Sequence, residues 1–210
     1  HFAYIVGYSD GTVRPNSSIT RAEVATIFFR LLNEDVRDKN LTRSNSFSDV
    51  SRGDWYNTAI STMAALGILD GYSDGTFRPN EPITRAEFAA IAARFDENAA
   101  SGSASFSDLS GHWAAGEISK AYKNGWVTGY SGGTFRPDQS ITRAEAVTLI
   151  NRVLERELPE DAELLDEMNV WSDNRDRRKW YYLDMQEATN SHDYTRDKKG
   201  KESWVKLRTD

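Results

Sequence analysis

The sequence predicts a mainly α-helical protein built from three repeats. One pattern, in which GYS is followed by a glycine turn, Arg-Pro and ITRAE, occurs at residues 7–23, 71–87 and 129–145. A second element, Phe-Ser-Asp with a tryptophan downstream, precedes the second and third copies. The repeat unit is therefore Phe-Ser-Asp, first helix, glycine turn and second helix, and such a repetition fixes the architecture before any single residue is interpreted.

The second helix of each unit begins at the TRAE sequence. A threonine at the N-cap position is followed by a glutamate at the third helical position, which is the pattern of a capping box. The isoleucine before each threonine can pack against the first turn as a hydrophobic staple. The capping pairs are Thr20 with Glu23, Thr84 with Glu87, and Thr142 with Glu145. Apolar residues then recur at helical spacing, so we expect the three TRAE helices to form a shared core.

The first helices are expected from about Tyr56 to Leu66 and from about Ala114 to Lys123, as amphipathic outer helices. Residues 73–76 predict a tight turn, because glycine adopts backbone angles that other residues avoid. Residues 77–79 predict a short extended piece, because proline disfavours helix in the residue before it.

The ends of the chain are irregular in a complementary way. The first repeat lacks its Phe-Ser-Asp element, whereas Trp171-Ser172-Asp173 restarts a first half that never reaches a glycine turn. We expect this half-repeat to complement the first repeat, either closing a ring or capping an exposed face. Alternatively, His1 is only a boundary and the tail belongs to no ring. The predicted domains are residues 1–46, 47–105, 106–169 and 170–210, with variable linkers around residues 33–46, 96–105 and 155–169.

The composition narrows the classes of function. A net charge of −6 gives no basic surplus for nucleic acid, and no apolar run is long enough for a membrane span. The start of the chain lacks the features of a signal peptide, so we expect any export signal to lie outside this segment. The chain has no cysteine, and His1, His112 and His192 show no metal-ligand spacing, so we expect neither a cofactor nor an obligatory metal. Glutamates that recur as capping residues do not resemble the unequal carboxylate pair of a glycosidase, so we expect no enzyme.

The Phe-Ser-Asp element with its downstream tryptophan, the GYSDGTFRP turn and the ITRAE helix start resemble the S-layer homology family. The resemblance covers residues 7–154 in detail and residues 171–190 in half-repeat form. It implies a pseudo-threefold assembly with the TRAE helices in a central bundle, surrounded by outer helices and short extended turns. It also implies an extracellular location at the cell wall or S-layer, and binding of secondary cell-wall polysaccharides, often pyruvylated, in grooves between repeats.

The arginine of each TRAE sequence is the first candidate for binding such a polymer. Arg21, Arg85 and Arg143 directly follow the N-cap, where the free amide groups of a helix already favour an anion. A guanidinium adds a planar, two-pronged donor that suits a carboxylate. The alternative is that each arginine pairs with an aspartate of a neighbouring repeat or is solvated.

Four further sets of residues recur in the repeats. Trp55, Trp113 and Trp180 offer apolar faces to sugar rings or belong to the core. Asp49, Asp108 and Asp173 accept sugar hydroxyls or cap the first helices. The pairs Gly7-Tyr8, Gly71-Tyr72 and Gly129-Tyr130 let the backbone approach a ligand, with the phenol as groove wall or as packing. Arg14, Arg78 and Arg136 are assigned to structural pairing, and Gly132, in place of the turn aspartate, makes the grooves unequal.

These observations favour a non-catalytic module that anchors a protein to the bacterial surface by binding an anionic, pyruvylated wall polysaccharide. A second hypothesis is a self-association module that builds a surface lattice through protein contacts. A third and weaker one is a wall hydrolase whose catalytic domain lies outside this segment.

Overall fold

The computed structural model describes residues 1–96 and 100–208. They form two compact units, the terminal unit (residues 1–17 and 142–210) and the central unit (residues 18–141). Residues 97–99 of the predicted second linker lie outside the described residues. The mainly α-helical class is confirmed, and no described helix is long and apolar enough to cross a membrane. The pseudo-threefold arrangement and the domain boundaries stay predictions.

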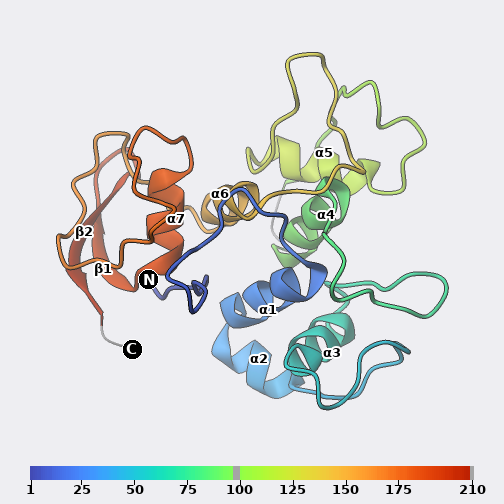
Figure 1. The fold of residues 1–210 in the computed structure, drawn as a ribbon. Helices are drawn as coiled ribbons and strands as arrows, with labels where there is room; N and C mark the ends of the chain where they lie inside the picture. Colours follow the sequence, from blue (N-terminus) through green and yellow to red (C-terminus); the bar gives the residue numbers. More distant parts are fainter. Residues whose placement is uncertain (97–99, 209–210) are drawn as a thin grey trace. The chain divides into compact units, whose positions relative to one another are not determined.

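The central unit is built from helix pairs (Figure 1). Its helices are α1 (Arg21–Leu31), α2 (Glu34–Asn40), α3 (Asn57–Ala65), α4 (Arg85–Phe95) and α5 (Ala115–Lys123). A TRAE helix packs against the first helix of the following repeat, α1 on α3 and α4 on α5. Phe28 lies at the centre of this core and contacts the rings of Phe88 and Phe95 edge-on, with centroids 5.7 and 5.1 Å apart. Helix α2 falls in a predicted linker and buries none of its residues.

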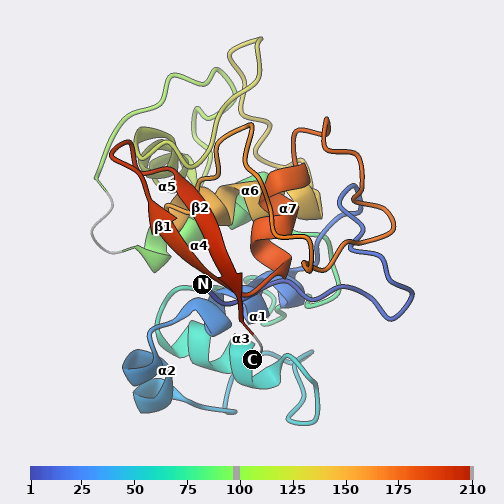
Figure 2. The ribbon, with the colours of Figure 1, turned by 90° about the vertical axis from the view of Figure 1, so that its left-hand side faces the viewer.

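The terminal unit combines the two ends of the chain. Its elements are α6 (Arg143–Val153), α7 (Tyr182–Thr189), β1 (His192–Arg196) and β2 (Glu202–Leu207). Helix α7 packs on α6, the third TRAE helix, and the two strands form an antiparallel hairpin beside α7 (Figure 2). The segment before Gly7 joins this unit through Tyr4, whose buried hydroxyl donates to Asn151 Oδ1 at 2.6 Å. The sequence did not predict the hairpin.

All three TRAE helices begin as the sequence predicts. Each threonine accepts from the backbone N–H at the third helical position, and each glutamate accepts from the backbone N–H of its threonine. The capping box is therefore complete in every copy. The start of each of these helices is specified locally, before any packing is considered.

The glycine turns are also confirmed. Gly11, Gly75 and Gly133 have φ values of 75°, 81° and 69°. The arginine that follows each turn also lies in the left-handed region, with φ of 50° at Arg14, 57° at Arg78 and 58° at Arg136. This conformation is costly for an arginine and persists only where surrounding contacts fix it.

The aspartate of each aromatic-Ser-Asp element supplies those contacts. Both carboxylate oxygens of Asp49 are used: the N–H groups of Phe77 and Arg78 donate to them at 2.7 Å each. Asp108 and Asp173 make the equivalent pairs with Phe135 and Arg136 and with Val13 and Arg14. The prediction that these aspartates cap the first helices is wrong, because the N-cap positions are Tyr56, Ala114 and Tyr181, and none of these makes a side-chain capping bond. The aspartates hold the strained turn instead.

Candidate carbohydrate-binding grooves

The first backbone N–H groups of each TRAE helix donate to backbone carbonyls of another repeat. The N–H groups of Arg21 and Ala22 donate to the carbonyls of Glu81 and Pro79 at 3.0 and 2.9 Å. The same pairs recur at Arg85 and Ala86 with Gln139 and Pro137, and at Arg143 and Ala144 with Ser17 and Pro15. The expectation that free amides at these helix starts attract an anion is therefore wrong, because the amides already have partners. The sequence could not show this, since the partners lie far along the chain.

The side chain of Arg21 is likewise held inside the protein. It is 5% exposed, its Nε donates to the Phe77 carbonyl at 2.8 Å, and its Nη1 pairs with Glu87 at 2.6 Å. Arg85 and Arg143 repeat the bond to a carbonyl, at Phe135 and Val13. Arg21 thus pairs with a neighbouring repeat, as the alternative interpretation expected, although its partner is a glutamate and not an aspartate.

A tyrosine lies between two arginines in every repeat. The Tyr72 ring is flanked by the guanidinium groups of Arg21 and Arg78, at 4.8 and 4.0 Å from its centroid. Its hydroxyl donates to Glu87 at 2.6 Å, and burial together with this hydrogen bond raises the pKa of Tyr72 to about 12. The equivalent stacks are Arg143 and Arg14 on Tyr8, and Arg85 and Arg136 on Tyr130. The tyrosines therefore form rigid walls, and cation–π contacts help to hold them.

The structural role predicted for the arginines before proline is confirmed in two repeats. Arg78 pairs with Asp74 and Arg14 with Asp10, both at 2.9 Å. In the third repeat Gly132 replaces the aspartate, and Arg136 keeps its stack on Tyr130 at 4.0 Å. The repeats are thus unequal at this turn.

The Gly-Tyr glycines do not leave room for a ligand. A Cβ on Gly71 would lie 2.3 Å from the Phe47 ring, and one on Gly129 would lie 2.1 Å from Phe106. At Gly7 the aromatic ring of Trp171 takes the same place, 2.0 Å away. The expected close approach of the backbone is therefore real, but its partner is the aromatic residue of the protein's own aromatic-Ser-Asp element.

The central unit contains a groove of about 700 Å³ along one side of α4. Glu87, Ala90, Ile91 and Arg94 of α4, with its N-cap Thr84, form this side, and residues 69–73, Phe77 and Ile83 form the adjoining wall. Arg21 and Tyr72 are part of the lining, and Trp113 and Asp138 come from the third repeat. The volume lies within the range of about 300–1,000 Å³ that is usual for small-molecule sites.

The three tryptophans predicted to contact sugars are largely exposed to solvent. Trp55, Trp113 and Trp180 are 66%, 60% and 63% exposed. Their placement in the core, the competing interpretation, is therefore wrong. A second groove, of about 310 Å³, lies in the terminal unit, and Trp180 lines it together with Arg152, Arg156 and Lys201.

Sequence reasoning missed the arginine near the end of each TRAE helix. Arg94 lines the larger groove, and its guanidinium contacts Asp70 at 2.5 Å and Glu117 at 3.6 Å. Arg152 lines the groove of the terminal unit. The signal was present, because Arg30, Arg94 and Arg152 stand at the same distance after TRAE in each copy. Both grooves therefore combine this arginine with the tryptophan of the following first helix.

The family model of the S-layer homology domain matches residues 3–25, 46–89 and 105–147. The chain belongs to the S-layer homology family. Among curated relatives, this S-layer homology chain is 36% identical over 211 residues to the cellulosome-anchoring protein of Acetivibrio thermocellus, covering 98% of the chain and 46% of the relative. It is 36% identical over 223 residues to cell surface glycoprotein 1 of the same organism, covering all of the chain and 9% of the relative.

Two further relatives extend the comparison. An S-layer protein of Bacillus licheniformis is 35% identical over 150 residues, 70% of the chain and 17% of the relative. An amylopullulanase of Thermoanaerobacterium thermosulfurigenes is 39% identical over 163 residues, which are 72% of the chain but only 8% of that enzyme. The chain thus spans less than half the length of these relatives. The family and the relatives place the S-layer homology chain at the bacterial cell surface, in the cell wall or S-layer.

Proposed function

We propose that this S-layer homology module anchors a protein non-covalently to the bacterial surface by binding an anionic, pyruvylated secondary cell-wall polysaccharide in grooves between its repeats. The observation that carries the proposal is the groove of about 700 Å³ in which exposed Trp113 accompanies Arg94. The module is not catalytic: the repeated glutamates Glu23, Glu87 and Glu145 are occupied in capping boxes. The enzyme-named relative matches over a small part of its length.

The tryptophan supplies the sugar-binding surface. An indole offers a broad apolar face to the C–H groups of a sugar ring and an N–H for a hydroxyl group. Because 60% of Trp113 is exposed, a sugar can stack on its ring without displacing much of the protein's own packing. Trp180 holds the same position at the start of its first helix and lines the groove of the terminal unit, so each of the two grooves carries one stacking surface.

Arg94 supplies the anion-binding group. Its side chain is 29% exposed and its present partners, Asp70 and Glu117, are 69% and 29% exposed. Exposed ion pairs contribute about 0–1 kcal/mol, so a bidentate carboxylate of a pyruvyl ketal can replace them at small cost. In this proposal Arg94 and Arg152 meet the anion.

The residues expected at the site then divide into two roles. The TRAE arginines Arg21, Arg85 and Arg143, the aspartates Asp49, Asp108 and Asp173, and the Gly-Tyr pairs shape and stiffen the groove walls. Arg94 and Trp113 make the ligand contacts. The separation is clearest at Arg21, which is 5% exposed and whose three nitrogens each donate inside the protein, whereas Trp113 is 60% exposed.

The experiment is isothermal titration of the chain with purified wall polymer, before and after removal of its ketal-linked pyruvate. We expect Trp113→Ala and Arg94→Gln each to weaken binding at least about tenfold, equivalent to about 1.4 kcal/mol. Trp55→Ala is the matched control, because it removes an equally exposed tryptophan that does not line this groove. Binding that survives both groove variants contradicts the proposed site. A chain that ignores the polymer but self-associates supports the lattice hypothesis instead.

A further inference from the structure

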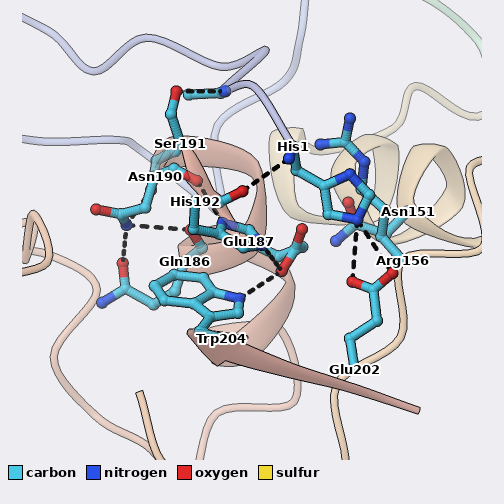
Figure 3. Close-up of polar contacts among 12 residues, drawn as sticks. His1, Asn151, Arg156, Gln186, Glu187, Asn190, Ser191, His192, Glu202 and Trp204 are labelled. Carbon is cyan, nitrogen blue, oxygen red and sulfur yellow. Dashed lines mark hydrogen bonds and ion pairs between the residues drawn. The ribbon is translucent and has the colours of Figure 1, made fainter. Parts of the chain in front are cut away.

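Four metal-ligating side chains meet inside the terminal unit, and one of them, Glu187, also lines the smaller groove. They are His1, Glu187 of α7, His192 of β1 and Glu202 of β2. One ligand atom from each lies within 4.8 Å of those of all the others (Figure 3). Three of the four residues are at most 1% exposed. The sequence spacing of the histidines gave no sign of this, because His1 and His192 stand at opposite ends of the chain.

Two polar atoms of this cluster are buried without a hydrogen-bond partner in the part of the chain that the structure describes. They are Nε2 of His192 and Oε1 of Glu187. His192 Nε2 lies 3.3 Å from the other oxygen of Glu187, outside hydrogen-bonding geometry. Leaving such groups unsatisfied in the interior is costly, and native structures contain few of them. An imidazole nitrogen and a carboxylate oxygen are both common ligands of metal ions.

The hydrogen bond at the other ring nitrogen fixes the tautomer of His192. Nδ1 lies 2.8 Å from the carbonyl oxygen of Asn190, and a carbonyl can only accept, so Nδ1 carries the proton. In the neutral ring the lone pair is then on Nε2, which faces the cluster. A backbone carbonyl at the distal nitrogen is the usual second partner of a metal-binding histidine.

Each carboxylate is held in place by a neighbour and keeps one oxygen available. Trp204 Nε1 donates to Glu187 Oε2 at 2.8 Å, which leaves Oε1. Arg196 donates to Glu202 Oε1 at 2.7 Å, and His1 Nε2 lies 3.0 Å from Oε1 and 3.1 Å from Oε2, so Oε2 faces the His1 ring. Such outer partners orient carboxylate ligands around a metal.

The imidazole rings are also oriented before any ion binds. The His1 ring stacks on Tyr194 at 3.9 Å, and the His192 ring stacks on Trp204 at 4.2 Å. The backbones of the two histidines pair, with the His192 N–H donating to the His1 carbonyl at 3.0 Å. The cluster thus has fixed positions for two imidazoles and two carboxylates.

We infer that this cluster is a binding site for one divalent transition-metal ion of the zinc class, with His1, Glu187, His192 and Glu202 as ligands. Two imidazole nitrogens and two carboxylate oxygens suit a four-coordinate zinc ion, with bonds of about 2.0–2.2 Å. A divalent cation also compensates the charge of two buried carboxylates, of which Glu202 is paired with the Arg196 guanidinium. The ion joins four separate segments of the terminal unit, so it acts as a structural clamp.

The test uses the full chain without a histidine tag and with a short Gly-Ser extension before His1. The extension removes chelation by a free terminal amine, while leaving the His1 imidazole unchanged. Co²⁺ is titrated as a spectroscopic probe, Zn²⁺ is then added to displace it, and bound metal is counted by elemental analysis. We expect one ion per chain, intensified visible bands typical of a tetrahedral site, and a higher thermal midpoint that chelation reverses.

Two substitutions and one control separate this site from adventitious binding. Glu187→Gln can still accept from Trp204 but loses the carboxylate ligand, and His192→Gln removes the Nε2 that faces the cluster. We expect each variant to weaken metal binding by about 100-fold or more, since losing a residue that only orients a metal ligand already costs about 10–100-fold. His112→Gln, in the central unit, is expected to change nothing. The inference is overturned if the wild-type chain binds no stoichiometric metal, or if the two variants bind as the wild type does. X-ray absorption at the zinc edge of the wild-type chain, expected to show two imidazole ligands, decides the case without any variant.

Discussion

Replacing Gly71 with alanine tests how tightly the glycine turn is locked to the aromatic-Ser-Asp element. The added Cβ would lie 2.3 Å from Phe47 Cε1 and 2.7 Å from the Thr76 carbonyl oxygen. Carbon atoms in contact normally stand about 3.5–4.0 Å apart, so the Phe47 ring would have to retreat by more than about 1 Å. That ring packs on Phe77, which is 1% exposed, with centroids 5.3 Å apart.

The second contact raises the cost. The Thr76 carbonyl accepts the Tyr72 N–H at 2.8 Å, so it cannot move aside without weakening the turn. Overpacking a core costs about 1–3 kcal/mol, and a lost hydrogen bond about 0.5–1.5 kcal/mol. We therefore expect Gly71→Ala to lower the free energy of unfolding by about 1.5–4.5 kcal/mol, the sum of the two terms.

Urea unfolding followed by tryptophan fluorescence and circular dichroism measures this loss. Gly53→Ala is the control, because nothing lies within 4 Å of the added Cβ and its φ is not positive. Such a change is expected to be neutral, or stabilising by up to about 1 kcal/mol. If Gly71→Ala and Gly53→Ala unfold at the same urea concentration, the inference that Phe47 packs too closely on this turn to admit a methyl group is refuted.

Three further changes test the turn and the helix starts. Asp49→Asn is nearly isosteric and keeps one acceptor for Phe77, but it places an NH₂ group against the Arg78 N–H. We expect the free energy of unfolding in urea to fall by about 2 kcal/mol. An unchanged midpoint would show that the Asp49 hydrogen bonds to this turn are unimportant for stability. Hydrogen bonds from Thr76 and Arg78 lower the pKa of Asp74 from 3.8 to about 2. Because the pKa of Asp74 is lower in the folded than in the unfolded state, its stabilisation is present above about pH 4 and is lost towards pH 2. The stability difference between the wild type and Asp74→Asn should therefore shrink over that range. A constant difference would contradict the lowered pKa. Thr84→Ala removes a capping box and should cost about 1 kcal/mol in thermal unfolding, whereas Thr84→Ser should restore it.

The local features of the fold could be predicted from the sequence because their causes lie close together in the chain. A capping box needs Thr84 and Glu87, and a glycine turn needs Gly75, so one repeat contains all that is required. The helix predicted from Tyr56 to Leu66 is observed at Asn57–Ala65 for the same reason, although six of its nine residues are buried and the outer position expected for it is not observed. Repetition strengthened each prediction, since three copies of one pattern leave little room for chance.

What could not be predicted depends on partners from distant segments. The helix-start amides of Arg21 and Ala22 are free in any single repeat and are occupied only when the carbonyls of Glu81 and Pro79 arrive from the next one. The same holds for the buried guanidinium of Arg21. The sequence leaves the tryptophans open to binding or to the core, because it does not reveal which side of an amphipathic helix start faces solvent. Exposure decided between the two interpretations.

The site residues divide in the same way. Trp113 stood out as an aromatic residue at a fixed place in the repeat, whereas Arg94 was overlooked among many charged residues near helix ends. The cluster of His1 and His192 lay beyond any spacing rule, since metal-ligand motifs describe residues close in sequence. Only the pairing of the two chain ends brings these rings within 5.4 Å of each other.

The composite make-up of the terminal unit dictates an order of events during synthesis. Residues 1–17 find their partners in residues 142–208: Trp171 covers Gly7, Asp173 holds the turn at Arg14, and Pro15 caps the start of α6. During synthesis residues 1–17 therefore wait for these partners until residues 142–208 have emerged, while the central unit can already form. The later segment decides when the earlier one folds. Loss of residues 171–208 is thus felt at residues 1–17.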